Sequence, residues 1–298
     1  MASPKASKGT LLSRLKQVLQ TEAGLVAVWV ATMTLIYYSA WGGLTLTNSS
    51  ISFGFIALGA KYVWDGKAQL PQQNQYPEER FVGYALATCG LALFWAMRSS
   101  ASFQYLAFVI ALAGLALALW GAGFFVTHWF ASLLIAIGLY PDLIFVANAL
   151  WRMATPPFVL ESAMGHWAGK ALNLVGQTAT VEGRYIATGN GAVEVASGCS
   201  GLDMAVSMAG VGLLMGLFFK QPWTKTLAAI ALGIVLALLI NIPRVMLLAY
   251  VVGNYGDGVF EFWHGPWGGQ IFMAILMTPY YYLVMAIFHA SGKSSRPA

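Results

Sequence analysis

Long apolar runs, separated by short polar segments, constrain the fold of this chain more than any other feature. A helix needs roughly 17–25 apolar residues to cross the hydrocarbon core of a bilayer, and most of these runs are about that long. Only 9% of the 298 residues are charged, whereas a soluble domain usually carries about a quarter. Backbone groups in lipid must bond to one another, which favours helices. The sequence therefore predicts an all-α polytopic membrane protein.

The apolar pattern predicts about eight transmembrane helices. In chain order they cover about 24–43, 46–64, 81–97, 102–120, 124–140, 202–219, 226–252 and 269–289. The second run is the weakest, because Asn48, Ser49 and Ser50 interrupt it; a partial or tilted insertion is the alternative there. No cleavable signal peptide is expected, since the first twenty residues are polar and basic and the first apolar run is long enough to stay in the membrane.

The segment before the sixth span is the largest insert with polar residues. Interfacial helices are expected over about 143–153 and 159–175. The alternation within 179–196, around Thr188-Gly-Asn-Gly191, favours a short β-hairpin. The expected organisation is a basic cytoplasmic tail (1–20), spans one to five (21–142), an extracytoplasmic insert (143–198), a catalytic transmembrane core with spans six to eight (199–290) and a second cytoplasmic tail (291–298).

The placement of lysine and arginine predicts the orientation, because cytoplasmic loops carry an excess of both. With both termini inside, the inner segments hold Lys5, Lys8, Arg14, Lys16, Lys61, Lys67, Arg80, Lys220, Lys225, Lys293 and Arg296. The outer segments hold Arg98, Arg152, Lys170 and Arg184. The net charge of +5 is explained by cations at span ends and tails, so nucleic acid is not an expected partner and membrane lipids are. The predicted location is the cell (inner or plasma) membrane.

Three polar groups that are rare in such a chain fall at one predicted membrane edge. Cys199 lies directly before the sixth span, and His264 lies in the outer loop between the seventh and eighth spans. Arg244 lies about 27 Å along the seventh span, at 1.5 Å per residue, which places it in the outer half. The orientation was predicted from the placement of lysine and arginine alone, without use of Cys199, Arg244 or His264. Their convergence on one edge is therefore an independent indication of an extracytoplasmic site.

The three groups suit nucleophilic catalysis. A thiolate is the reactive form of cysteine, and a helix N-terminus and a cation are expected to lower the pKa of Cys199. Arg244 is costly in a span and should face a protein or water cavity. His264 could take the thiol proton and return it to a leaving amine. Each group alone has a plain alternative: an inert thiol, a snorkelling arginine or an aromatic-belt histidine.

Four further residues are candidates for supporting roles. Ser200 and Gly201 form a tight turn that could bring backbone N–H groups near a reacting carbonyl. Asn241 lies on nearly the same helix face as Arg244. Asp203 could orient Arg244 or His264, although a simple interfacial carboxylate is an equal alternative.

The remaining sulfur and imidazole groups do not suggest a metal centre. Cys89 falls in the middle of a span and is expected to be a small buried residue. Two cysteines do not make a disulfide framework, and the four histidines show no ligand spacing. We therefore expect no metal and no cofactor.

These residues carry a resemblance to a known family. Gly-Cys-Ser-Gly (198–201), Asn-Ile-Pro-Arg (241–244) and His264, in that order and at those span ends, resemble the exosortase/archaeosortase family of membrane transpeptidases. The resemblance covers most of residues 140–290. It implies processing of exported proteins that end in a small motif of the PEP-CTERM type, a transmembrane helix and a basic tail.

By this resemblance, Cys199 attacks a peptide bond near the motif and forms a thioester. Arg244 stabilises the developing charge or the thiolate, and His264 acts as general acid and base. An unidentified acyl acceptor, or water, then resolves the thioester. Two other classes remain open: a transporter or channel in which Arg244 binds an anionic substrate, and a membrane acyltransferase that uses Cys199.

Overall fold

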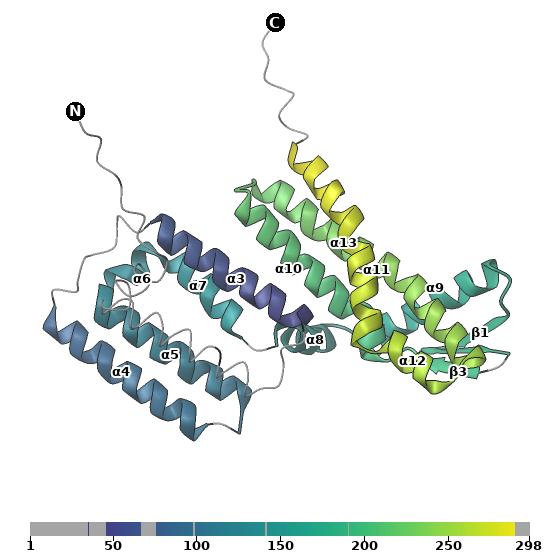
Figure 1. Ribbon diagram of the computed structural model, residues 1–298, viewed down its shortest axis with the longest axis horizontal. Helices are drawn as coiled ribbons and strands as arrows, with labels where there is room; N and C mark the ends of the chain where they lie inside the picture. The colour runs from purple at the N-terminus through teal and green to yellow at the C-terminus, as the bar shows by residue number, and fades with distance from the viewer. Residues whose placement is uncertain are drawn as a thin grey trace, which may run out of the picture. The chain divides into compact units, whose positions relative to one another are not determined.

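The computed structural model describes residues 35, 46–66, 76–97, 99–140, 142–189 and 191–289 (Figure 1). Apart from Leu35, the predicted first span lies outside the described residues, as do both tails. The described part is mostly helical, with one small sheet. The chain divides into two compact units, Met1–Ser49 with Tyr62–Pro141, and Ser50–Lys61 with Asp142–Ala298. The helix α3 (Leu46–Asp65) confirms the second predicted helix.

In the first unit, α4 (Pro77–Ala96) and α5 (Ala101–Trp120) confirm the third and fourth predicted helices. Small residues let their backbones approach closely: a Cβ at Gly83 would lie 2.5 Å from the backbone nitrogen of Ala118. Such contacts are typical of helix pairs in membranes. The expectation that Cys89 is buried was wrong, because its side chain is exposed on α4; the glycine and alanine positions of this helix take the packed face instead.

The predicted fifth helix is broken in two. The segments are α6 (Gly123–Thr127) and α7 (Trp129–Leu139). The break is at His128, whose backbone leaves the helical region (φ −114°, ψ 27°). Its buried ring stacks on Phe124, with 5.1 Å between ring centroids. Hydropathy along the sequence is continuous here, so it gave no sign of the break.

The second unit begins with α8 (Leu143–Ala154) and α9 (Val159–Leu174), as predicted for the insert. It continues through the sheet and a short 3-10 helix, η2 (Ser197–Cys199), to α10 (Leu202–Phe218) and α11 (Trp223–Asn254). The last two helices are α12 (Asp257–His264) and α13 (Pro266–His289). The sequence prediction placed a loop where α12 lies, so that expectation was wrong; α12 is short, at 8 residues, and amphipathic.

The sheet has three antiparallel strands, β1 (Ala179–Glu182), β2 (Tyr185–Thr188) and β3 (Gly191–Glu194), in that order. The predicted turn after Thr188 is confirmed, with Thr188 opposite Gly191. The predicted hairpin is β2–β3, and a second turn at Gly183-Arg184, which pairs Glu182 with Tyr185, adds a third strand that was not predicted. Gly183 adopts φ +58°, a conformation that glycine tolerates at little cost.

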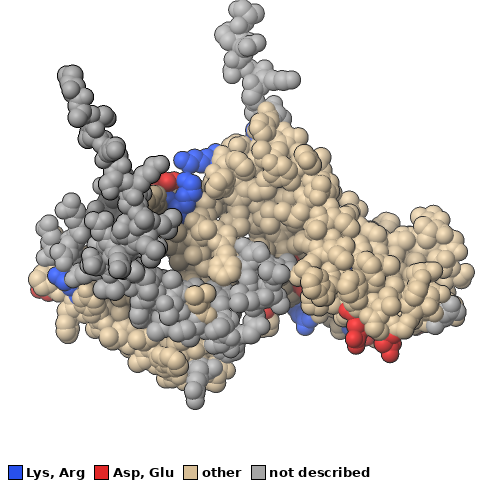
Figure 2. All heavy atoms as spheres, in the orientation of Figure 1, with Lys and Arg blue, Asp and Glu red and all other residues tan. Residues whose placement is uncertain are grey.

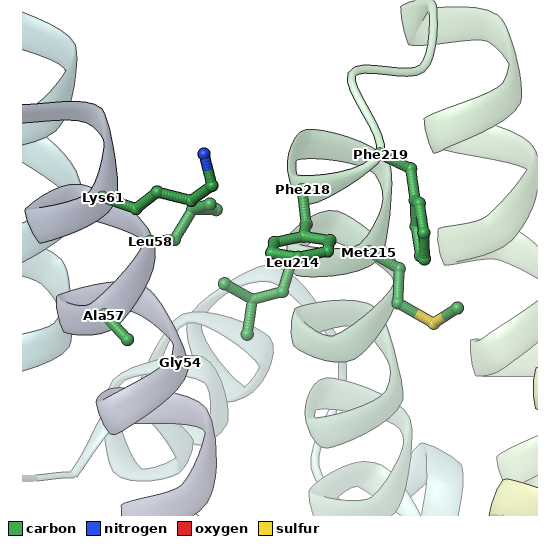
Figure 3. Close-up of a pocket in the computed structure, with 8 residues that line it drawn as sticks. All are labelled: Gly54, Ala57, Leu58, Lys61, Leu214, Met215, Phe218 and Phe219. Atoms are coloured by element: carbon green, nitrogen blue, oxygen red, sulfur yellow. The ribbon is translucent and has the colours of Figure 1, made fainter. Parts of the chain in front are cut away.

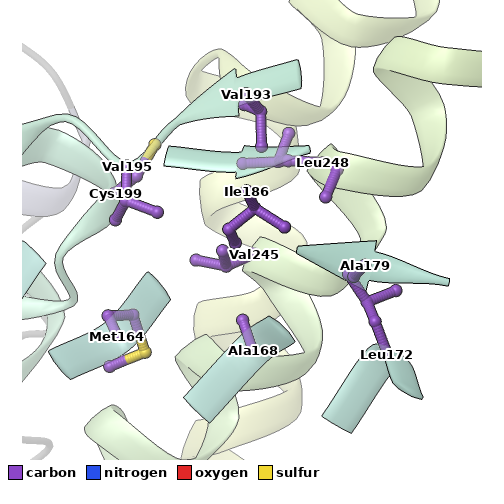
Figure 4. Packing of buried hydrophobic residues seen from close by; sticks show 11 residues of the cluster. Met164, Ala168, Leu172, Ala179, Ile186, Val193, Val195, Cys199, Val245 and Leu248 are labelled. Atoms are coloured by element: carbon purple, nitrogen blue, oxygen red, sulfur yellow. The ribbon is translucent and has the colours of Figure 1, made fainter. Parts of the chain in front are cut away.

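One face of this sheet forms a hydrophobic core with α9 and α11 (Figure 4). Along β3 and the segment after it, Val193 and Val195 are buried while Ala192 and Glu194 are exposed, which is the pattern of a sheet covered on one side. The members of this core, here called the Cys199 cluster, are Met164, Ala168, Leu172, Ala179, Ile186, Val193, Val195, Cys199, Val245, Leu248 and Ala249. The candidate nucleophile is therefore part of a packed core.

Three described helices are long and apolar enough to cross a membrane: α5, α11 and α13. The apolar α10 is shorter, at 17 residues, and α7 and α8 pass the same test only when they are counted together. The count of eight spans stays a prediction. Figure 2 shows that charged side chains occupy only small parts of the visible face, as expected for a protein surrounded by lipid.

Candidate active site

The segment from β3 to α10 positions Cys199. After Val195 the chain tightens into η2, where the Cys199 N–H donates to Ala196 O at 2.9 Å. The hydroxyl of Ser200 donates to Ser197 O at 2.7 Å. Gly201 then adopts φ +85° and forms the N-cap of α10. These local bonds fix the cysteine directly before the helix, with both Cys199 and Ser200 buried.

Asn241 ties this segment to α11. Its Nδ2 donates to Cys199 O at 2.7 Å, and the side chain is fully buried. A Cβ added at Gly201 would lie 3.0 Å from Asn241 Nδ2. Glycine is therefore required at position 201 for two reasons: the backbone has a positive φ, and the side-chain amide of Asn241 leaves no room for a Cβ. The Gly-Cys-Ser-Gly turn and Asn241 are thus in direct contact, which was not predicted from the sequence.

Arg244 is buried one turn further along α11, with 7% of its surface exposed. It shares a buried stripe with Asn241, Val245 and Leu248, which follows the helical spacing i, i+3, i+4, i+7. Its Nε is buried without a partner, and no described residue accepts a hydrogen bond from the guanidinium. A buried cation without an acceptor is costly, so this group is poised for a negatively charged or carbonyl oxygen.

The environment of Cys199 raises the pKa of its thiol above the ordinary value. Burial is the main cause; the positive charge of Arg244 lowers the pKa, and the negative charge of Asp203 raises it further. The sequence-based expectation of a lowered pKa was therefore wrong, because the desolvation of the thiolate outweighs the cation. The resting cysteine is a thiol and needs a base.

Asp203 has a partner that the sequence reasoning missed. Its Oδ1 accepts a hydrogen bond from Asn148 Nδ2 at 2.9 Å, and Asn148 also donates to Ile144 O in its own helix. This contact joins α8 to the start of α10. The carboxylate is thus paired with an amide rather than with Arg244 or His264. A signal for Asn148 was present, since it is a polar residue in the middle of the apolar run 143–151, although nothing in that run indicates its partner.

His264 is not joined to the other two groups. It is the last residue of α12 and is exposed. Its ring stacks on Phe260, with centroids 5.2 Å apart, and it makes no hydrogen bond within the described residues. Phe260 and Trp263 pack against the Cys199 cluster, so α12 is anchored to the core that holds the thiol. The structure brings together Cys199, Ser200, Gly201, Asp203, Asn241 and Arg244, and leaves His264 at the surface of the same unit.

An apolar pocket of about 300 Å³ lies elsewhere in this unit (Figure 3). Its lining residues come from α3 and from the far end of α10: Gly54, Ala57, Leu58, Lys61, Leu214, Met215, Phe218 and Phe219. Because α10 rises 1.5 Å per residue, this pocket is about 20 Å from the start of the helix. It is not part of the thiol site.

No set of three His, Cys, Asp or Glu side chains suited to a metal ion occurs among the described residues.

A family model described as transmembrane exosortase matches residues 45–281. Searches of curated proteins and of solved structures gave no match. The matched segment covers most of the chain and contains Cys199, Arg244 and His264. The chain therefore belongs to the transmembrane exosortase family.

Proposed function

We propose that this multi-pass membrane protein is a cysteine protease and transpeptidase that cleaves the C-terminal sorting signals of exported proteins. The substrates carry a short motif, a transmembrane helix and a basic tail. The cleaved protein is carried as a thioester on Cys199 and then passed to an acceptor or released by water. Family membership gives the class of reaction, and the described side chains support the assignment of roles.

One observation supports the proposal most strongly: the side chain of Arg244 is buried, and its Nε has no acceptor among the described residues. A planar guanidinium can donate two parallel hydrogen bonds to oxygen. In a site shielded from water such a donor stabilises an oxyanion without reorganising. Arg244 therefore suits the charge that develops on the scissile carbonyl.

The proposed reaction gives each of the three residues one role. His264 takes the proton of Cys199, and the thiolate attacks the carbonyl carbon of the scissile peptide bond. The C–N bond breaks, the departing nitrogen takes the proton from His264, and a thioester remains. An amine or water then attacks the thioester, the C–S bond breaks, and the thiol is restored with its proton. His264 is exposed in the resting protein; catalytic hydrogen bonds often form only with substrate bound.

The supporting residues hold this geometry. Asn241 fixes the backbone carbonyl of Cys199. Ser200 braces the turn, and Gly201 allows α10 to begin directly after it. Asp203 raises the pKa of Cys199 and would thereby limit the reactivity of the free thiol. The site faces the extracytoplasmic side in this proposal, with both termini in the cytoplasm.

The test is co-expression with a tagged exported protein from the same genome that ends in a motif, an apolar helix and a basic tail. The wild-type chain should shorten this protein, and Cys199→Ala should leave it intact. The mass of the new C-terminus distinguishes transfer from hydrolysis. Undiminished cleavage by Cys199→Ala would refute the nucleophile assignment. Incorporation of a lipid-linked acyl group without cleavage would favour an acyltransferase.

A further inference from the structure

The two edges of the small sheet differ in how their backbone groups are satisfied. An unpaired edge strand is a template for another extended chain, and proteins usually cover such edges. At β1 the side chain of Asn173 donates to Ala179 O at 2.9 Å and accepts from Ala179 N at 2.8 Å. Val181 on the same strand packs against Gly169 of α9. The β1 edge is therefore capped at Ala179, and the side chain of Val181 holds the strand against α9.

The β3 edge is open at its outward N–H groups, whereas the outward carbonyl of Glu194 already accepts a hydrogen bond from Ala196 N at 3.0 Å. Val195 N donates to Arg184 O at 2.9 Å, so these two residues form a hydrogen-bonded pair. Because such pairs alternate along an antiparallel ladder, Val193 and Gly191 also point their backbone groups toward β2. The backbone N–H and C=O groups of Ala192 and Glu194 point away from β2. Both residues are exposed, and their N–H groups have no acceptor among the described residues.

The open edge leads directly to the candidate nucleophile. Only five positions separate Glu194 from Cys199, which is at most about 17 Å of chain. Figure 4 shows the end of β3 and Cys199 on the same side of the core. Past Cys199 the chain enters α10 within three residues. A substrate whose apolar helix follows the cleaved bond would run in the same direction: extended first, and then helical.

We infer that β3 is the docking strand for the substrate. The residues on the N-terminal side of the scissile bond pair as a fourth strand, parallel to β3, with the N–H groups of Ala192 and Glu194. Main-chain pairing of this kind gives affinity without requiring a particular side chain. The inference rests on the proposed function and adds the class of ligand contact: an extended peptide bound through its backbone.

The test compares Ala192→Pro with Ala192→Thr in the full-length membrane protein. Proline removes the outward N–H but no bond to β2, because residue 192 is in a non-hydrogen-bonded pair; threonine keeps the N–H and suits a strand. With the tagged substrate described above, Ala192→Pro should lower kcat/KM about threefold to tenfold, the loss of one hydrogen bond, chiefly through KM. Alkylation of Cys199 by iodoacetamide should proceed at the wild-type rate in both variants.

Equal kcat/KM in the two variants would overturn the docking strand and leave the proposed function intact. Absence of Cys199-dependent cleavage by the wild-type chain would instead overturn the proposed function. Hydrogen exchange covers the case in which the proline variant misfolds. In Cys199→Ala with saturating uncut substrate, exchange in residues 191–196 should slow. Unchanged exchange with substrate bound would also contradict the inference.

Discussion

The thiol of Cys199 lies near two opposing charges, and these decide how its reactivity depends on pH. Burial raises the pKa of the thiol, so the thiolate fraction is small at neutral pH and grows as the pH rises. The positive charge of Arg244 favours the thiolate, and the negative charge of Asp203 disfavours it. Replacing each charge should therefore move the pKa of the thiol in opposite directions.

The rate of Cys199 alkylation against pH measures this balance. Asp203→Asn should lower the midpoint, because it removes a negative charge and keeps the side-chain shape. Arg244→Leu should raise the midpoint, because it removes the cation that stabilises the thiolate. The Cys199→Ala variant supplies the background from Cys89. Midpoints that move in the reverse directions would show that neither side chain acts on the thiol as described.

Arg244→Lys separates charge from geometry. Lysine keeps the positive charge but cannot donate two parallel hydrogen bonds to an oxyanion. We expect kcat to fall by about 100-fold or more, the usual cost of removing an oxyanion donor, with a smaller change in the alkylation midpoint than in Arg244→Leu. Turnover close to wild type would make Arg244 a snorkelling anchor rather than a catalytic residue.

Two glycines flank the nucleophile and form a matched pair. A Cβ at Gly201 would meet Asn241 at 3.0 Å on a backbone with φ +85°, whereas a Cβ at Gly198 would meet nothing within 4 Å. Gly201→Ala should lower the free energy of unfolding by about 1–3 kcal/mol and reduce turnover. Gly198→Ala should change both little. Thermal unfolding in detergent and the cleavage assay measure the two effects; equal losses in the two variants would contradict this account of the turn.

At the scale of elements, the long helices and the order of the site motifs were predictable from sequence. Apolar length and period identify the helices at α4, α5, α10, α11 and α13. Details set by tertiary contacts were not predictable. His128 is buried at the break, and α12 is held by Phe260 and Trp263 against the Cys199 cluster.

In the candidate site, too, some features were predictable from the sequence and others were not. Gly-Cys-Ser-Gly and Asn-x-x-Arg were identifiable as motifs, but the hydrogen bond from Asn241 to Cys199 O was not predicted. The raised pKa of Cys199 was not predictable, because the sequence does not reveal how deeply the thiol is buried. The bond between Asn148 and Asp203 joins residues that are 55 positions apart, and no local pattern indicates it.

The capped residue at the β1 edge, Ala179, gives a prediction for the insert. Asn173 satisfies both backbone groups of Ala179, so Asn173→Ala leaves them unpaired at the edge of the core. We expect the free energy of unfolding to fall by about 1–3 kcal/mol. Thr180→Ala, on the exposed face of the same strand, is the control and should be nearly neutral. A thermal midpoint unchanged in Asn173→Ala would show that water replaces the amide without cost.

For the whole molecule, the distribution of positive charge predicts the orientation. In a chain with Cys89→Ser and Cys199→Ala, Gln177→Cys should react with a membrane-impermeant maleimide in intact cells. Gln221→Cys should react only after permeabilisation, because the segment between α10 and α11 carries Lys220 and Lys225 and is predicted to be cytoplasmic. The opposite labelling pattern would place the thiol site in the cytoplasm and remove exported proteins as substrates.

The central claim is that Cys199 carries the substrate as a thioester. The direct measurement is intact mass spectrometry of the purified wild-type protein, quenched in acid during turnover of the tagged substrate. We predict an adduct on Cys199 with the mass of the N-terminal cleavage product, removed by hydroxylamine and missing in Cys199→Ala. Continued cleavage with no adduct on Cys199 at any time point, including at pH values that slow thioester hydrolysis, would contradict covalent catalysis by this residue.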